Sequence, residues 1–173
     1  RHLGKLFQDL LDISKAEDDI KRVGVFSDDM PQNIITRIYN YNLDDVQLDG
    51  AESPVMIDNL RRTLDPDIHA GIKIMKRIVI TKREDIEKYK EYAEGVDYFL
   101  FDIQDNLKDW SILEAYDGKV PFLISGNIGT EDVEKIKGFS HPQFYGISVN
   151  EKFETAPAVK DVALLKDFLE KVK

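Results

Sequence analysis

The chain has 173 residues, 42% of them hydrophobic, and a formal net charge of −9 at pH 7. A chain of this length can bury one large core and no Pro/Gly/Ser-rich linker divides it, so we expect a single domain over residues 1–173. The 24 Lys and Arg residues are dispersed among 33 acidic residues. This pattern argues against a nucleic-acid partner, because phosphate contacts need clustered cations.

The sequence contains no cysteine, which excludes a disulfide framework and a thiolate metal site. His2, His69 and His141 lie far apart without metal-ligand spacing, so we expect no bound metal. No apolar run approaches the length of about 18 residues that a membrane span needs. No basic-then-apolar signal segment opens the chain. We therefore expect a cytoplasmic protein that has no membrane partner.

The first predicted elements are a helix over residues 1–19 and a strand–helix–strand unit over residues 21–54. Val23 to Phe26 is a short apolar run, typical of a strand buried on both faces. The following helix, with Pro31 in its first turn, is expected to turn four apolar or aromatic side chains toward a sheet. These are Ile34, Ile35, Ile38 and Tyr39.

The rest of the chain repeats the strand–helix pattern. Further strands are predicted over residues 46–48, 70–75, 96–103, 121–125 and 144–149, and helices over 53–64, 84–95, 109–116, from 130, and 159–173. Residues 76–80 either extend the third strand or form a loop. Strict alternation predicts a parallel sheet covered by helices, either an open doubly wound sheet or a barrel.

The short, even loops favour the barrel. A complete (β/α)8 barrel typically has about 250 residues. We therefore expect an α/β fold of the TIM type, a (β/α)8 barrel whose first two strands are absent from this sequence. An oligomeric state follows from each case: a monomer if the barrel is full, and a homodimer if two strands are missing, because open sheet edges pair with other chains.

Several motifs occur in one order along the chain. They are KRVGVF, VQLDGAESP, DYFLFDI, DW, PFLISGNI and FETAPAVKD. In these motifs the chain resembles the phosphoribosylanthranilate isomerase family of tryptophan biosynthesis, over nearly all of residues 1–173. The resemblance implies a cofactor-free isomerase whose partner is a small phosphorylated substrate. Its reaction would be the Amadori rearrangement of N-(5-phosphoribosyl)anthranilate to the 1-deoxyribulose 5-phosphate derivative, by general acid and base catalysis.

The resemblance also implies roles for single residues. Asp102, at the end of DYFLFDI, falls on the position of the catalytic general acid. Arg1 falls on an arginine that would hold the anthranilate carboxylate. Gly126, Asn127 and Asn150 fall on the loops that bind the phosphate group. The general base of the family lies on a first strand that this sequence does not contain.

The residues by themselves leave other interpretations open. A strand-end aspartate such as Asp102 can cap a loop, and Gly126 can be a turn glycine. Asp49 stands in the place of a family histidine, Glu151 in that of a serine, and the loop 103–108 is short and lacks glycine. A second interpretation is therefore a noncatalytic phosphate-binding or interaction barrel of the same family. A third is a phosphosugar barrel enzyme with a different base.

Overall fold

The computed structural model describes residues 20–67, 71–105, 107 and 109–173. The chain forms two compact units, residues 1–75 and 76–173. Strand β3 (Lys73–Ile80) runs through the boundary between them. The helix predicted over residues 1–19 lies outside the described residues, and the single domain predicted for the whole chain stays a prediction.

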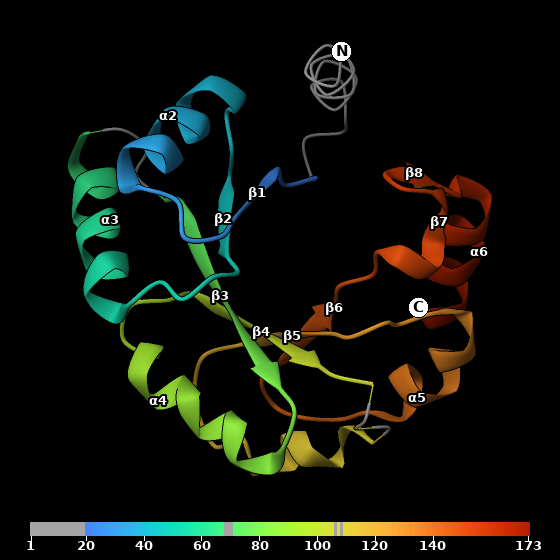
Figure 1. The fold of residues 1–173 in the computed structure, drawn as a ribbon. Coiled ribbons are helices and arrows are strands. Elements are labelled where there is room, and N and C mark those ends of the chain that lie inside the picture. Colours follow the sequence, from blue (N-terminus) through green and yellow to red (C-terminus); the bar gives the residue numbers. More distant parts are fainter. Residues whose placement is uncertain (1–19, 68–70, 106, 108) are drawn as a thin grey trace. The chain divides into compact units, whose positions relative to one another are not determined.

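The first unit alternates strands and helices, as the sequence predicted. Its elements are β1 (Val23–Phe26), α2 (Pro31–Tyr41), β2 (Asp45–Leu48), α3 (Pro54–Asp67) and the start of β3. Strands β1 and β2 are parallel, with Phe26 opposite Leu48. The amide of Lys73 donates to the carbonyl oxygen of Asp44 at 3.2 Å, which places the start of β3 beside β2. Helices α2 and α3 lie side by side (Figure 1).

The core of the first unit comes from the apolar stripes of its helices and from β2. Its fully buried side chains are Ile34, Ile38, Val46, Leu48, Ile57, Leu60 and Leu64. Tyr39 was predicted to face the sheet but is 79% exposed. One residue after Ile38 is about 100° further around the helix, so Tyr39 points away from the buried stripe.

Strand β1 was predicted to be buried on both faces, and this prediction was wrong. Phe26 is buried, whereas Val23 and Val25, which point to the opposite face, are exposed. Alternating side chains therefore leave one face of this strand in contact with solvent.

The second unit holds four strands of the sheet and a separate hairpin. Its elements are the rest of β3, a 3₁₀ helix (Arg83–Lys88), α4 (Tyr89–Tyr92), β4 (Tyr98–Ile103), a 3₁₀ helix (Trp110–Ala115), β5 (Phe122–Ser125), a 3₁₀ turn (Thr130–Asp132), α5 (Val133–Gly138), β6 (Phe144–Ile147), a 3₁₀ turn (Glu151–Phe153), β7 (Glu154–Ala156), β8 (Val159–Lys160) and α6 (Val162–Val172). The sheet order is β1-β2-β3-β4-β5-β6, the order of the chain. The open question about residues 76–80 is thereby settled, because they belong to β3.

Strands β4, β5 and β6 are parallel neighbours, as expected for strand–helix repeats. Asp102 lies opposite Ser125 in the β4–β5 ladder. The amide of Gln104 donates to the carbonyl oxygen of Ile80 at 3.1 Å, which places the end of β3 beside the end of β4. The carboxyl ends of these strands therefore meet at one edge of the sheet.

An aromatic cluster fixes which side chains of β4 face the helices. Phe99 and Phe101 pack with Tyr116 and Phe122, and the ring centroids of Phe101 and Tyr116 are 5.2 Å apart. The Tyr116 hydroxyl donates to the carbonyl oxygen of Val120 at 2.6 Å, and burial raises the pKa of Tyr116 to about 12. Because side chains alternate along a strand, Asp102 must project from the opposite face of β4.

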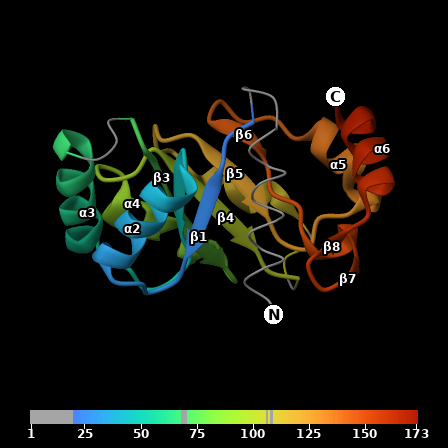
Figure 2. The same ribbon diagram turned by 90° about the horizontal axis from the view of Figure 1, so that it is seen from above.

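The end of the chain departs from the prediction. A helix was predicted from Val159, but Val159 and Lys160 form β8, antiparallel to β7, and α6 begins only at Val162. Asp161 caps that helix, since its carboxylate accepts a hydrogen bond from the amide of Leu164 at 3.0 Å. Helices α5 and α6 lie side by side (Figure 2).

Candidate active site

The site is assembled at the carboxyl ends of β4, β5 and β6, where loops of the second unit converge. The key junction is Gly126, which follows β5 and has φ +125°. A Cβ atom there would lie 1.9 Å from the carbonyl oxygen of Ile103, the last residue of β4. Only glycine allows the loop after β5 to approach the end of β4 this closely.

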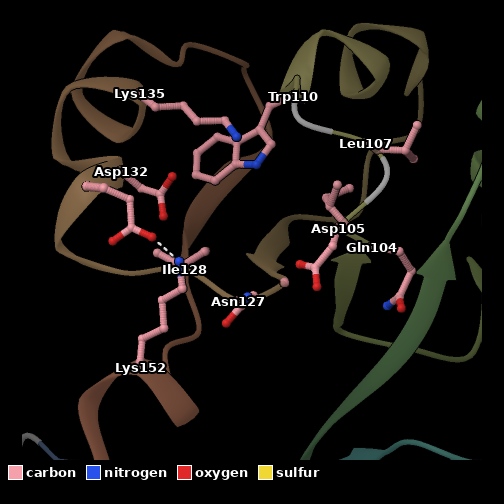
Figure 3. A pocket seen from close by; sticks show the side chains of 12 residues that line it. Gln104, Asp105, Leu107, Trp110, Asn127, Ile128, Asp132, Lys135 and Lys152 are labelled. Atoms are coloured by element: carbon pink, nitrogen blue, oxygen red, sulfur yellow. Dashed lines mark hydrogen bonds and ion pairs between the residues drawn. The ribbon is translucent and has the colours of Figure 1, made fainter.

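A pocket of about 410 Å³ opens beside this junction (Figure 3). It is lined by residues that follow β4, β5 and β6, together with Trp110 and the start of α5. The lining residues are Ile103, Gln104, Asp105, Leu107, Trp110, Gly126, Asn127, Ile128, Glu131, Asp132, Lys135 and Lys152. Asn127 adopts a left-handed conformation, φ +51°, which asparagine tolerates better than most residues.

Two interactions fix the position of Trp110 in the pocket wall. Asp109 caps its 3₁₀ helix, because the carboxylate accepts hydrogen bonds from the amide and hydroxyl of Ser111 at 2.9 and 2.7 Å. The bond from the amide lowers the pKa of Asp109 below its ordinary value. On the other side, the Lys135 ammonium lies 4.6 Å from the centroid of the Trp110 ring (Figure 3).

The charges around the pocket are mixed. Lys152 forms an ion pair with Glu131, and Asp132 accepts a hydrogen bond from the amide of Gly129 at 2.8 Å. Figure 3 shows Lys152 beside Ile128 and Asn127, below the pocket. An anionic ligand could recruit Lys152, but it would compete with the Glu131 carboxylate for that ammonium.

Asp102 is not part of the pocket lining, although it lies on the same edge of the sheet. Its Oδ2 accepts a hydrogen bond from Nε of Arg77 at 2.8 Å and is also paired with Nη2 of the same guanidinium. The side chain of Asp102 is 13% exposed and that of Arg77 is 29% exposed. Asp102 is therefore a largely buried carboxylate with one firmly bound cation.

The predicted site residues are only partly gathered by the structure. Gly126 and Asn127 line the pocket, and Asp102 lies one residue before Ile103 at its edge. Asn150 is exposed and outside the lining, with its side chain and carbonyl oxygen accepting from Lys160. Arg1 lies outside the described residues.

The sequence prediction missed Arg77. The assignment of residues 76–80 was open, so the face to which each side chain points could not be read. Because these residues belong to β3, their side chains alternate between the two faces of the sheet. Lys76 is buried and lies over the Tyr92 ring of α4, so Arg77 points to the opposite face.

The described residues provide neither a metal-binding cluster nor a membrane-spanning helix. None of their His, Asp and Glu side chains form a group of three or more that could hold a metal ion. None of their helices has the length and hydropathy to cross a bilayer.

Residues 7–171 match the model of the family described as N-(5'phosphoribosyl)anthranilate (PRA) isomerase. The chain belongs to the PRA isomerase family. The family assigned from the sequence motifs is thereby confirmed.

Two relatives show how strong this membership is. N-(5'-phosphoribosyl)anthranilate isomerase of Parabacteroides distasonis is 39% identical over 159 residues, which are 88% of this chain and 69% of that protein. The protein of the same name from Phocaeicola vulgatus is 34% identical over 159 residues, which are 88% of this chain and 74% of that protein. The matched region therefore takes in nearly all of the present chain.

Solved structures of PRA isomerases also resemble the chain. The mutually generated monomers of the dimeric Thermotoga maritima enzyme match with a TM-score of 0.76 and 25% identity, covering 95% of this chain and 78% of that one. A PRA isomerase in complex with reduced 1-(o-carboxyphenylamino)-1-deoxyribulose 5-phosphate matches with a TM-score of 0.79 and 24% identity, with the same coverages. Of the two predicted architectures, the likeness supports the TIM-type α/β fold.

Proposed function

We propose that this chain catalyses the Amadori rearrangement of N-(5-phosphoribosyl)anthranilate, with Asp102 as the general acid. Family membership supports the reaction, and the observation that carries the role of Asp102 is its position. It is a largely buried carboxylate at the carboxyl end of β4, opposite Ser125 and next to the Gly126 turn. Catalytic residues of TIM-type enzymes lie at this end of the strands.

The chemistry requires two proton transfers. Protonation of the ribose ring oxygen accompanies cleavage of its bond to C1, and the nitrogen lone pair forms the C1–N double bond of an iminium ion, which keeps the N–H proton. Transfer of the C2 proton to a general base then gives a neutral enolamine, which tautomerises to the ketone, so that the product is an isomer of the substrate. Asp102 would supply the first proton. The reaction needs no cofactor.

We assign the phosphate group of the substrate to the pocket beside Gly126. Gly126 permits close approach of backbone, and Asn127 lies in the pocket wall. Lys152 and Lys135 both line the pocket, and Lys152 is our candidate cation for the phosphate, provided that it leaves Glu131. Asn150, in the loop after β6, would also contribute to binding of the phosphate group. Arg1 remains our proposed ligand of the anthranilate carboxylate, on the family resemblance alone, and the cytoplasm remains our proposed location.

The test is consumption of N-(5-phosphoribosyl)anthranilate, followed by its fluorescence. The wild-type protein should turn the substrate over, and Asp102→Asn should reduce kcat by at least about 10²-fold, the usual contribution of a general acid. Asp167→Asn is the matched control, because Asp167 is an ion-paired aspartate of α6, with Lys171, outside the pocket lining. It should keep wild-type kcat.

Two results would count against the proposal. Unchanged turnover by Asp102→Asn would remove its role as acid. Absence of turnover by the wild-type protein, together with binding of the reduced product analogue, would favour the noncatalytic phosphate-binding barrel instead.

A further inference from the structure

We propose that Arg77 is a positioning residue that holds the carboxyl group of Asp102 by Oδ2, so that Oδ1 can carry and deliver the proton. This inference rests on the proposed function, because it gives the proposed acid a partner. Arg77 lies on β3. Along β3, Ile74, Lys76, Ile78 and Ile80 are all buried, whereas Arg77 is intermediate in exposure.

The face to which Arg77 points is set by its neighbours. Lys76 is 3% exposed, with its ammonium 5.5 Å from the ring centroid of Tyr92 in α4, so its side chain faces the helix layer. Arg77, the next residue, projects from the other face. Asp102 does the same on β4, because Phe101 and Ile103 on either side of it are buried. The two side chains thus meet on one face of the sheet.

The contact between them is asymmetric. Both Nε and Nη2 of Arg77 are bonded to the same oxygen, Oδ2 of Asp102, with the first distance 2.8 Å. Among the described residues, Oδ1 accepts no hydrogen bond. A guanidinium that grips one oxygen restrains rotation of the carboxyl group and leaves the other oxygen available to a ligand.

This arrangement suits an acid that must present a proton in one direction. Proton transfer requires the donor to lie within hydrogen-bonding reach of the substrate atom, and a misplacement of about 1 Å can lower a rate by about 10²-fold. After transfer, Asp102 is a carboxylate, and the adjacent guanidinium, which stays charged, stabilises that anion. Arg77 would therefore act on the reaction through Asp102, without contact with the substrate.

The experiment compares Arg77→Met, which keeps the stem and removes the charge, with Arg77→Lys, which keeps a charge. The Met variant should lower kcat by about 10²-fold. Its KM, and its affinity for the reduced product analogue, should stay within about threefold, because Arg77 is not assigned to binding. The Lys variant should recover at least about tenfold of the lost kcat. Arg62→Met, which removes an exposed arginine of α3 paired with Asp58, is the matched control and should match the wild type.

A double-variant cycle separates positioning from a structural role. In the Asp102→Asn background, Arg77→Met should lower kcat by no more than about twofold further, because the group that it positions is gone. Thermal unfolding of each variant shows that the protein measured is folded.

Three results would overturn the inference. One is a Met variant with kcat within about threefold of the wild type. Another is a loss that appears in KM alone, which would make Arg77 a substrate-binding residue. A third is full additivity with Asp102→Asn. If the wild-type protein itself does not turn over the substrate, the proposed function fails, and the positioning role fails with it.

Discussion

Replacement of Gly126 by alanine tests the junction on which the site depends. The residue has φ +125°, and an added Cβ would lie 1.9 Å from the carbonyl oxygen of Ile103, about 1.5 Å short of ordinary contact. The obstacle is backbone at the end of β4, which cannot rotate away as a side chain could. The loop after β5 must therefore move away from β4.

The magnitude has two parts. A non-glycine residue in a disfavoured backbone conformation costs about 1–3 kcal/mol. Separation of the two strand ends weakens at least one hydrogen bond near the pair of Asp102 and Ser125, worth about 0.5–1.5 kcal/mol. Together these give a loss of about 2–4 kcal/mol in the free energy of unfolding, or roughly 10 °C in Tm for a protein of this size.

Two other glycines separate the two contributions. Gly71 has φ +100° but no described atom within 4 Å of an added Cβ, so Gly71→Ala should show the backbone term alone, about 1–3 kcal/mol. Gly138, at the end of α5, has neither problem, and Gly138→Ala should change stability by less than about 1 kcal/mol. Urea unfolding measures all three variants. If Gly126→Ala loses no more stability than Gly71→Ala, the close approach of the β5 loop to β4 is not a steric requirement.

Two further predictions concern charge. Glu131→Gln should lower the KM for the phosphorylated substrate by about two- to fivefold, because Lys152 loses its competing partner. Lys152→Met should raise the same KM. A higher KM in Glu131→Gln would contradict this role of Lys152. Burial works to raise the pKa of Asp85, but hydrogen bonds from Thr81 and Lys82 outweigh it and hold this pKa well below its ordinary value. Because the folded-state pKa is lowered, the stabilisation by Asp85 is present above about pH 4 and is lost as the pH falls further. Urea unfolding from pH 7 to pH 2 should therefore show a shallower acid-side decline in Asp85→Asn than in the wild type, and equal slopes would refute the assignment.

Much of the fold could be predicted because its strands are apolar runs bounded by polar turns. Val23 to Phe26, Phe122 to Ser125 and the strand that ends at Ile103 all lie where the sequence placed them, to within two residues. The helix starts at Pro31 and Pro54 were equally clear, since proline is suited to the first turn.

The β7–β8 hairpin escaped prediction because its strands are too short to show an alternating pattern. Its turn is formed by Pro157 and Ala158, and Ala158 adopts φ +63°, a conformation that favours glycine. Proline followed by a residue with positive φ is typical of a type II turn, but alanine hides that signal in the sequence. The apolar residues that follow were therefore assigned to one continuous helix.

The candidate site was predictable only where family motifs mark it. The motif DYFLFDI places Asp102 at a strand end, and the motif PFLISGNI places Gly126 at the turn after the next strand. Arg77 could not be recognised as a site residue from the sequence, because its role depends on Asp102, which lies 25 residues later on the neighbouring strand. The pairing of Lys152 with Glu131 likewise joins two loops whose proximity follows from parallel strand order rather than from local sequence.

The most direct test of the account is a single-turnover measurement with protein in excess over N-(5-phosphoribosyl)anthranilate. This experiment follows the chemical step without product release. The wild-type protein should convert all bound substrate in one exponential phase, whereas Asp102→Asn should bind the substrate and convert it at least about 10²-fold more slowly. Conversion by Asp102→Asn at the wild-type rate would contradict the role of this carboxyl group and, with it, the assignment of the active site.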